Sequence, residues 1–313
     1  MEPRKLALVG IGKIARDQHI PSLNASKDWE LVATVSRHAQ VDGIEAFEDI
    51  ETMLAARPDI DVISLCVPPA PRFAYAAAAL NANRHVMLEK PPGATLSECH
   101  VLERMAEKAG RSIYATWHSR EAAMVDAARV WLSDKQVHRV EMQWKEDVRY
   151  WHPGQDWVFN PGGMGVFDPG INGLSILTKI LPKPMHITSA TLDFPENRQT
   201  PIAAQLAFHY PGASGSFAEL DWLQQGDPIW SIFVETDAGV LTLENGGARM
   251  LIDGEEIKSA EDAVALQGEY PRLYARMNDL VAKGESEMDL RPMYLVADAF
   301  AIGERRSKPA FEW

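Results

Sequence analysis

The first third of the chain alternates short apolar runs with segments whose apolar residues recur at helical spacing. Turn-forming residues end each run, which is typical of strands buried on both faces of a parallel sheet. Strands are expected at residues 6–9, 30–35, 59–67, 86–88 and 112–116, and helices near residues 14–23, 50–54, 73–82 and 96–109. Such alternation with short connections predicts an α/β, doubly wound, mostly parallel sheet.

The pattern changes near Val137, where several short strands follow one another without regular intervening helices. Residues 137–144 alternate apolar and polar side chains, as a half-buried strand does. Further strands are expected at residues 187–194, 202–210, 214–222, 230–236 and 240–243. Tightly joined strands predict a C-terminal α+β domain with a large, mainly antiparallel open sheet. We therefore expect two domains, residues 1–120 and residues 121–313.

A GxGxxA sequence directly follows the first predicted strand. In such a turn the first glycine allows a tight reversal, the second lets the backbone approach a pyrophosphate, and the small third residue lets helix pack on strand. The amides that begin the next helix would face the phosphates. The motif is weak by itself, but here a strand precedes it and a helical pattern follows. It predicts dinucleotide binding through Gly10, Gly12, Lys13 and Ile14.

The end of the second predicted strand indicates which dinucleotide binds. Units that bind NAD usually place an acidic residue there, to interact with the ribose 2′-hydroxyl. This chain has Ser36, Arg37 and His38 instead. A hydroxyl and a guanidinium suit a 2′-phosphate better, because arginine grips phosphate through two parallel hydrogen bonds. We predict that NADP is preferred and that NAD is a second cofactor; the alternative is that Arg37 is merely a surface loop residue.

Two further strand ends carry residues expected near a ligand, because open α/β sheets bind ligands at the carboxyl ends of their strands. Val67 and Pro68 end one predicted strand, and Glu89, Lys90 and Pro91 end the next. Proline cannot donate to a sheet ladder, so the strand must stop there and leave the lysine at its carboxyl end. From these residues alone, a solvated lysine at an ordinary strand end remains the alternative.

Charge and composition narrow the class of protein. The chain of 313 residues has 31 lysines and arginines against 44 aspartates and glutamates, and a net charge of -13 disfavours general nucleic-acid binding. The two cysteines, Cys66 and Cys99, are isolated, which favours a reducing compartment. No apolar stretch is long enough to span a bilayer or to act as a signal peptide. We expect a cytoplasmic protein without a membrane partner.

The N-terminal GxGxxA turn, the Val-Pro-Pro strand end and the Glu-Lys-Pro sequence together resemble the Gfo/Idh/MocA family of oxidoreductases. The resemblance covers nearly the whole chain, and Glu89-Lys90-Pro91 is its most specific motif. It implies an N-terminal Rossmann domain, a cis bond before Pro91, and a Lys90 side chain directed at the nicotinamide and the substrate oxygen. Val67, Pro68 and Glu89 would then lie beside the cofactor. In this family the open face of the C-terminal sheet is a candidate surface for a homo-oligomer.

A second candidate site follows a glycine-rich turn at residues 162–165. Asp168 and Asn172 lie four residues apart in a segment with helical spacing and would share a neighbouring face. Asp168 before Pro169 also looks like an ordinary helix N-cap. The resemblance favours a site, since family members carry an Asp after such a turn and, four residues later, usually a His facing the nicotinamide. Asparagine cannot act as a general base, so we assign proton acceptance to Asp168 and substrate hydrogen bonding to Asn172.

Aromatic and imidazole residues near predicted strand ends are consistent with a sugar substrate. The apolar C–H faces of a sugar stack on indoles, while its hydroxyls need polar partners. Trp151 and His152 lie just before the glycine-rich turn, His118 follows the predicted strand at 112–116, and Trp230 begins another strand. Any one tryptophan could equally belong to the core. These side chains show no metal-ligand spacing, so we expect no metal.

The Asp168 and Asn172 pair resembles the aldose 1-dehydrogenases of this family, which act on L-arabinose or D-galactose. We therefore predict oxidation of a sugar at C1 to the lactone by hydride transfer to NADP or NAD. Lys90 would stabilise negative charge on O1, and Asp168 would accept the proton. A second interpretation is oxidation of a ring hydroxyl, as in inositol dehydrogenases, although the missing histidine argues against it. A third is a non-catalytic, NAD(P)-binding regulator that senses sugars, since fold does not imply function.

Overall fold

The computed structural model describes residues 2–258 and 268–313. The chain divides into two compact units. The first contains Met1–Trp117 and Tyr270–Asp289, and the second contains His118–Glu269 and Leu290–Trp313. The division expected at residue 120 differs from this one chiefly because residues 270–289 return to the first unit.

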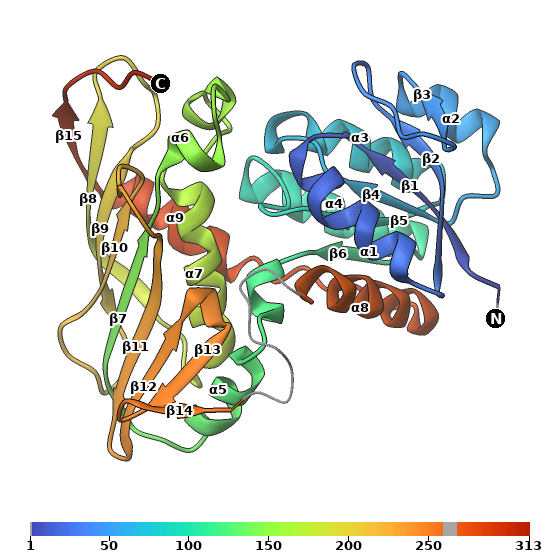
Figure 1. The fold of residues 1–313 in the computed structure, drawn as a ribbon. Helices are drawn as coiled ribbons and strands as arrows, with labels where there is room; N and C mark the ends of the chain where they lie inside the picture. The colour runs from blue at the N-terminus through green and yellow to red at the C-terminus, as the bar shows by residue number, and fades with distance from the viewer. Residues whose placement is uncertain (1, 259–267) are drawn as a thin grey trace. The chain divides into compact units, whose positions relative to one another are not determined.

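Among the described residues, the first unit contains a sheet of six strands, all parallel to their neighbours (Figure 1). They are β1 (Arg4–Val9), β2 (Trp29–Val35), β3 (Glu45–Phe47), β4 (Val62–Leu65), β5 (His85–Leu88) and β6 (Ile113–Ala115). Their order is β3-β2-β1-β4-β5-β6. The strands β1 to β3 extend to one side and β4 to β6 to the other, so the topological switch point lies between β1 and β4, where such sheets bind dinucleotides. The predicted doubly wound sheet is confirmed. The short edge strand β3 was not predicted, because it buries no side chain fully and shows no apolar run.

Successive residues of a strand point to opposite faces of the sheet. Helices cover both faces of this one. The helices are α1 (Ile20–Ala25), which follows a π-helical turn η1 (Ala15–His19), α2 (Ile50–Ala56), α3 (Pro69–Asn81), α4 (Leu96–Ala109) and α8 (Glu269–Lys283). Ala7 and Val9 of β1 join one apolar cluster with residues of α2, α3 and α4. Leu6 and Leu8 join a second cluster with residues of α1 and α8.

Helix α8 explains why residues 270–289 return to the first unit. Its buried residues recur at helical spacing and pack against β1; they are Tyr270, Leu273, Tyr274, Met277 and Leu280. Burial of this apolar face is the driving force that attaches the helix to the sheet.

The second unit contains, within the described ranges, a sheet of nine strands. They are β7 (Val137–Lys145), β8 (His186–Pro195), β9 (Ala203–His209), β10 (Ser216–Asp221), β11 (Ile229–Thr236), β12 (Gly239–Glu244), β13 (Arg249–Ile252), β14 (Glu255–Ile257) and β15 (Glu304–Lys308). Their order is β14-β13-β12-β11-β7-β10-β9-β8-β15, and neighbours are antiparallel except for β7 beside β10 and β8 beside β15. The predicted, mainly antiparallel sheet is confirmed. Strands β13 to β15 were not predicted, and two of them, β14 and β15, bury no side chain that could reveal them.

One face of this sheet is covered by helices and the other is open (Figure 1). The helices are α5 (Val125–Leu132), α6 (Val148–Trp151), α7 (Phe167–Ile180) and α9 (Arg291–Ile302), with 3-10 turns η2 (His118–Glu121), η3 (Asp156–Phe159) and η4 (Asn245–Gly247). Helix α7 lies close to β7, since a Cβ added to Gly173 would fall 2.5 Å from the Met142 sulfur. On the open face, Lys145 pairs with Glu219 at 2.6 Å. No helix in the described part of the chain has the length and apolar character needed to cross a membrane.

Candidate functional site

The residues predicted to bind a dinucleotide lie at the carboxyl edge of the first sheet. This edge is formed by β2, β1, β4 and β5, which are neighbours in that order. Backbone hydrogen bonds continue past the strand ends, since the Gly10 amide donates to Val35 and the Cys66 amide donates to Val9. The predicted residues that follow these four strands are Gly10, Gly12, Lys13, Ile14, Ser36, Arg37, His38, Val67, Pro68, Glu89 and Lys90. The fold thus brings them to one edge, while their contacts with a cofactor remain predictions.

Gly10 has the geometry that a dinucleotide-binding turn needs. Its φ is +90°, and an added Cβ would lie 2.8 Å from Cγ1 of Val67 and 2.9 Å from its backbone nitrogen. A side chain here would therefore collide with the segment after β4. At Gly12, by contrast, no atom of the described residues lies within 4 Å of an added Cβ. The turn thus packs tightly against the sheet on one side and leaves space for a phosphate on the other.

The loop after β2 contains Ser36, Arg37 and His38. The Ser36 hydroxyl accepts a hydrogen bond from the His38 amide at 3.4 Å, which shapes a short turn. Arg37 is exposed at this strand end, where a guanidinium suits a phosphate. The exposed Lys13 ammonium pairs with Asp17 one helical turn further on, and contact of Lys13 with a pyrophosphate stays a prediction.

Glu89 and Lys90 follow β5 in a segment whose backbone is held on both sides. The buried Glu89 carboxylate accepts hydrogen bonds from the Lys90 amide at 2.9 Å and from the Tyr270 hydroxyl at 2.8 Å. The buried Arg72 guanidinium donates to the carbonyl oxygens of Glu89 and Pro91. The Lys90–Pro91 bond is cis, as the family resemblance implies. These contacts fix the Lys90 backbone at the carboxyl end of the strand.

Asp168 lies in the first turn of α7 with 4% of its surface exposed. Its Oδ2 is 3.1 Å from Nε2 of His152. The N-cap of α7 is Val166 and no side chain caps it, so the interpretation of Asp168 as an ordinary N-cap is wrong. The preceding glycine-rich turn is needed for close approach: Gly165 has φ +57°, and an added Cβ would lie 2.2 Å from the Pro201 carbonyl oxygen.

Two of the predicted tryptophans belong to an aromatic group beside β11. Trp230 lies on this strand and stacks on Trp144 with ring centroids 6.1 Å apart, and Trp151 lies tilted against Trp230 at 5.4 Å. His152 packs edge-on against Trp222 at 5.6 Å. Trp151 and Trp230 are only partly buried, so part of each ring remains accessible. Rigid, partly exposed indoles of this kind can serve as a platform for the apolar face of a sugar.

His118 has different neighbours from those of His152. It is buried in η2, and its Nδ1 lies 2.7 Å from the Glu269 carboxylate. Asn172 is half-buried on α7, one turn beyond Asp168. Both side chains have defined positions in the second unit, and their roles in substrate binding remain predictions.

Glu146 binds tryptophans of the aromatic group, although the sequence pattern did not predict a role for it. It directly follows β7 and is 5% exposed. Its carboxylate accepts hydrogen bonds from the indole N–H groups of Trp230 at 2.9 Å and Trp222 at 3.4 Å. A signal was present, because alternate residues of β7 up to Trp144 are buried and Glu146 continues that phase. An acidic residue on the buried side of a strand needs hydrogen-bond donors, from the protein or from a ligand.

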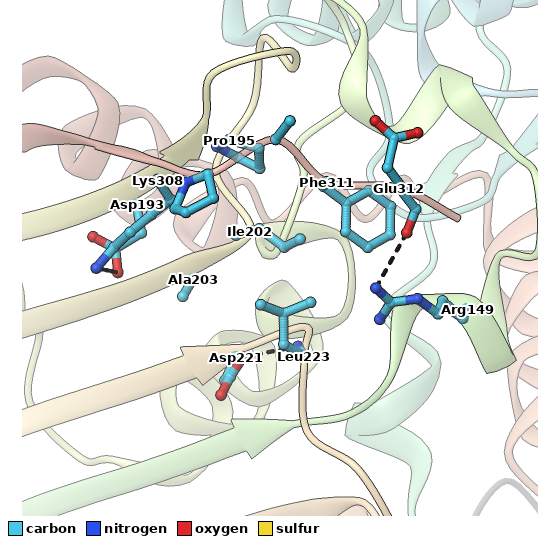
Figure 2. Close-up of a pocket in the computed structure, with 12 residues that line it drawn as sticks. Arg149, Asp193, Pro195, Ile202, Ala203, Asp221, Leu223, Lys308, Phe311 and Glu312 are labelled. Carbon is cyan, nitrogen blue, oxygen red and sulfur yellow. Dashed lines mark hydrogen bonds and ion pairs between the residues drawn. The ribbon is translucent and has the colours of Figure 1, made fainter.

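A cavity of about 440 Å³ lies elsewhere in the second unit, between the sheet and the C-terminal segment (Figure 2). Asp193, Ala203 and Asp221 are paired across β8, β9 and β10 along its wall. Lys308 pairs with Asp193 at 3.2 Å. None of the predicted substrate-binding residues is among the described residues that line this cavity, so we do not assign it to the substrate.

Comparisons with known proteins identify similar chains. Residues 4–116 match the Gfo/Idh/MocA model, described as an oxidoreductase family with an NAD-binding Rossmann fold. The galactose 1-dehydrogenase of Pseudomonas fluorescens is 42% identical over 312 residues, which cover 99% of each chain. The crystal structure of a D-galactose-1-dehydrogenase from Rhizobium etli has a TM-score of 0.93 at 49% identity and covers 100% of this chain and 99% of that one. A 3-ketoreductase from Actinomadura kijaniata, in complex with NADP and TDP-benzene, has a TM-score of 0.83 at 16% identity, covering 98% of this chain and 100% of that one, and shares the fold.

Proposed function

Since the chain belongs to the Gfo/Idh/MocA family of oxidoreductases, we propose that it is an aldose 1-dehydrogenase that oxidises D-galactose or L-arabinose at C1 to the lactone. The observation that carries the proposal is its similarity, over nearly the whole chain, to two galactose 1-dehydrogenases at 42% and 49% identity. The second unit supports it, because buried Asp168 contacts His152 and the indoles of Trp151 and Trp230 lie against each other. A carboxylate can accept a proton, and indoles can stack on a sugar.

The proposed chemistry assigns one task to each polar residue. An anomeric hydroxyl is a weak acid, so its proton must leave O1 as the C1–H bond breaks. Asp168 would accept that proton, directly or through water, and its contact with His152 at 3.1 Å orients the carboxylate. The Lys90 ammonium would stabilise the negative charge that develops on O1. Asn172 and His118 would hydrogen-bond other hydroxyls of the sugar.

NAD(P), the cofactor of this fold, supplies the hydride acceptor when it is bound. The turn after β1 fits its pyrophosphate, because Gly10 has no room for a side chain and the space beside Gly12 is open. Val67, Pro68, Glu89 and Lys90 would line the nicotinamide side of the same edge. Ser36, Arg37 and His38 would contact the ribose and, in NADP, its 2′-phosphate.

Replacing Arg37 by alanine is expected to raise the KM for NADP roughly tenfold or more, because a charge-assisted hydrogen bond contributes roughly 1.5–3 kcal/mol. The KM for NAD should change little, since NAD has no 2′-phosphate. Initial rates at saturating sugar with each cofactor varied in turn give both constants. Arg104→Ala, an exposed arginine on α4, is the control for loss of charge. An equal rise in KM for both cofactors would instead indicate that Arg37 maintains the structure of the loop.

Replacing Glu146 by glutamine is expected to raise the KM for the sugar about tenfold, in keeping with the loss of one charge-assisted hydrogen bond. Glutamine preserves the volume, but its amide N–H₂ cannot accept from an indole N–H as a carboxylate oxygen does. The aromatic group would then shift, while the KM for NADP stays unchanged. Glu219→Gln is the matched control, because Glu219 pairs with Lys145 on the open face of the same sheet. An unchanged sugar KM would restrict Glu146 to a structural role.

The experiment that tests the proposed function is a substrate panel with purified protein. Formation of reduced nicotinamide is followed with NADP and then NAD against D-galactose, L-arabinose, D-xylose, D-glucose and myo-inositol. Turnover with D-galactose or L-arabinose, with the lactone identified by mass spectrometry, would support the proposal. Activity with myo-inositol alone would replace it with ring-hydroxyl oxidation. Tight cofactor binding without any turnover would favour a sugar-sensing regulator.

A further inference from the structure

A buried hydrogen-bond network lies beneath Lys90 in the first unit. Oε2 of Glu89 accepts from the Lys90 amide at 2.9 Å, while Oε1 accepts from the Tyr270 hydroxyl at 2.8 Å and lies 3.0 Å from Nε2 of His19. The carboxylate is 5% exposed, and His19 and Tyr270 are each 1% exposed. A buried carboxylate is costly unless donors surround it, so these two side chains keep Glu89 in place as an acceptor for the Lys90 backbone.

The orientation of His19 is itself determined by its neighbours. Its Nδ1 lies 2.7 Å from the Tyr274 hydroxyl, and the imidazole packs edge-on against Tyr270 at 4.8 Å and Tyr274 at 5.7 Å. Burial alone would lower the pKa of His19, but interactions with Cys66, Tyr274 and Glu89 outweigh it and raise that pKa well above its ordinary value. Because a carboxylate can only accept, Nε2 of His19 carries the hydrogen that is donated to Glu89.

This network joins elements that are far apart in the sequence. His19 ends η1, Glu89 follows β5, and Tyr270 lies in the first turn of α8, so the pairs are separated by 70 and 181 residues. An ordinary strand end needs none of these buried groups, because water would solvate an exposed carboxylate there. These groups converge on the Glu89 carboxylate, which accepts from the Lys90 amide, so they restrain the backbone of the lysine.

We propose that His19 and Tyr270 are positioning residues that act through the Glu89 carboxylate to hold Lys90 where it stabilises charge on the sugar oxygen. This inference rests on the proposed function for the step that Lys90 serves. Small displacements of a catalytic group are costly: an error of about 1 Å can reduce the rate on the order of a hundredfold. Neither His19 nor Tyr270 needs to touch the substrate or the cofactor for this effect.

The test is a double-mutant cycle with Lys90. Tyr270→Phe and His19→Gln keep most of the buried volume, and each should lower kcat for the sugar roughly tenfold to hundredfold with little change in the KM for NADP. In a Lys90→Met background the same changes should lower kcat by less than about twofold, because the group they position is absent. Tyr210→Phe is the matched control, since Tyr210 is a tyrosine of similar burial in the second unit whose hydroxyl accepts from the Lys183 amide.

A second measurement needs no turnover. Hydrogen exchange of the Lys90 amide, followed by mass spectrometry on the protein with NADP, should be roughly tenfold faster in Tyr270→Phe and His19→Gln than in wild type. Equal losses of kcat in both backgrounds, or an unchanged Lys90 amide, would overturn the inference. If the wild type oxidised no sugar, the proposed function would fail, and the exchange rate would still decide whether these residues hold Lys90.

Discussion

Replacing Lys90 by methionine is expected to lower kcat for the aldose about 10²- to 10³-fold, the cost typical of removing one preorganised donor from a developing oxyanion. Methionine keeps most of the length of lysine but has no ammonium group. The backbone at this position should stay in place, because Glu89 and Arg72 hold it through main-chain groups. Initial rates at saturating sugar and NADP give kcat. Fluorescence titration with NADPH gives the cofactor Kd, which should change little.

Two further variants test whether the loss of kcat is specific to the ammonium of Lys90. Lys5→Met removes an exposed ammonium that pairs with Asp59 at 2.8 Å in the same unit, and it should leave kcat unchanged. Lys90→Arg retains the charge, but a planar guanidinium does not occupy the place of an ammonium, so it should recover little activity. A Lys90→Met protein with near wild-type kcat would exclude the ammonium from the chemical step.

Replacing Asp168 by asparagine is expected to lower kcat about 10²- to 10⁴-fold, the contribution typical of general acid–base catalysis. Asparagine has the same shape and can still hydrogen-bond His152, but it cannot accept the proton from O1. The KM for NADP should be unchanged, because the predicted cofactor residues belong to the other unit. Steady-state rates at saturating sugar and cofactor measure the loss.

Chemical rescue distinguishes a missing base from a misfolded site. In Asp168→Ala, added formate should restore part of the lost kcat, because a small carboxylate can fill the space and accept the proton. Asp126→Asn is the control, since Asp126 is an exposed carboxylate of the same unit that pairs with Lys179. Full activity of Asp168→Asn would transfer proton acceptance to another group, and His152 would be the first candidate.

Local sequence pattern accounts for most of the fold. The buried strands of the first sheet were predictable because apolar runs flanked by turn residues alternate with helical segments, which is typical of a parallel sheet with both faces covered. The alternation of 137–144 likewise indicated a strand with one covered face, which the structure confirms in β7. Edge strands such as β15 have no buried side chains, so hydrophobic pattern carries no information about them.

The return of α8 to the first unit could not be predicted from the local sequence pattern. Periodic apolar residues create a face that must be buried, but they do not specify which sheet buries it. Tyr270 and Leu273 pack in one cluster with Leu6 of β1 and Leu23 of α1, so α8 and α1 together bury that side of the parallel sheet. The choice depends on surfaces that exist only after the sheet has formed.

In the candidate site too, some residues could be predicted from local motifs, whereas their hydrogen-bond partners could not. Motifs predicted that Gly10, Lys90 and Asp168 lie near ligands, because strand direction and small-residue turns are local properties that bring such residues to one edge or to a helix start. The partners of these residues were not predictable: Asp168 meets His152 at 3.1 Å, and Glu89 meets Tyr270 across 181 residues. Hydrogen-bond partners distant in sequence are selected by packing, so tertiary structure alone decides which polar groups orient the residues that the motifs identify.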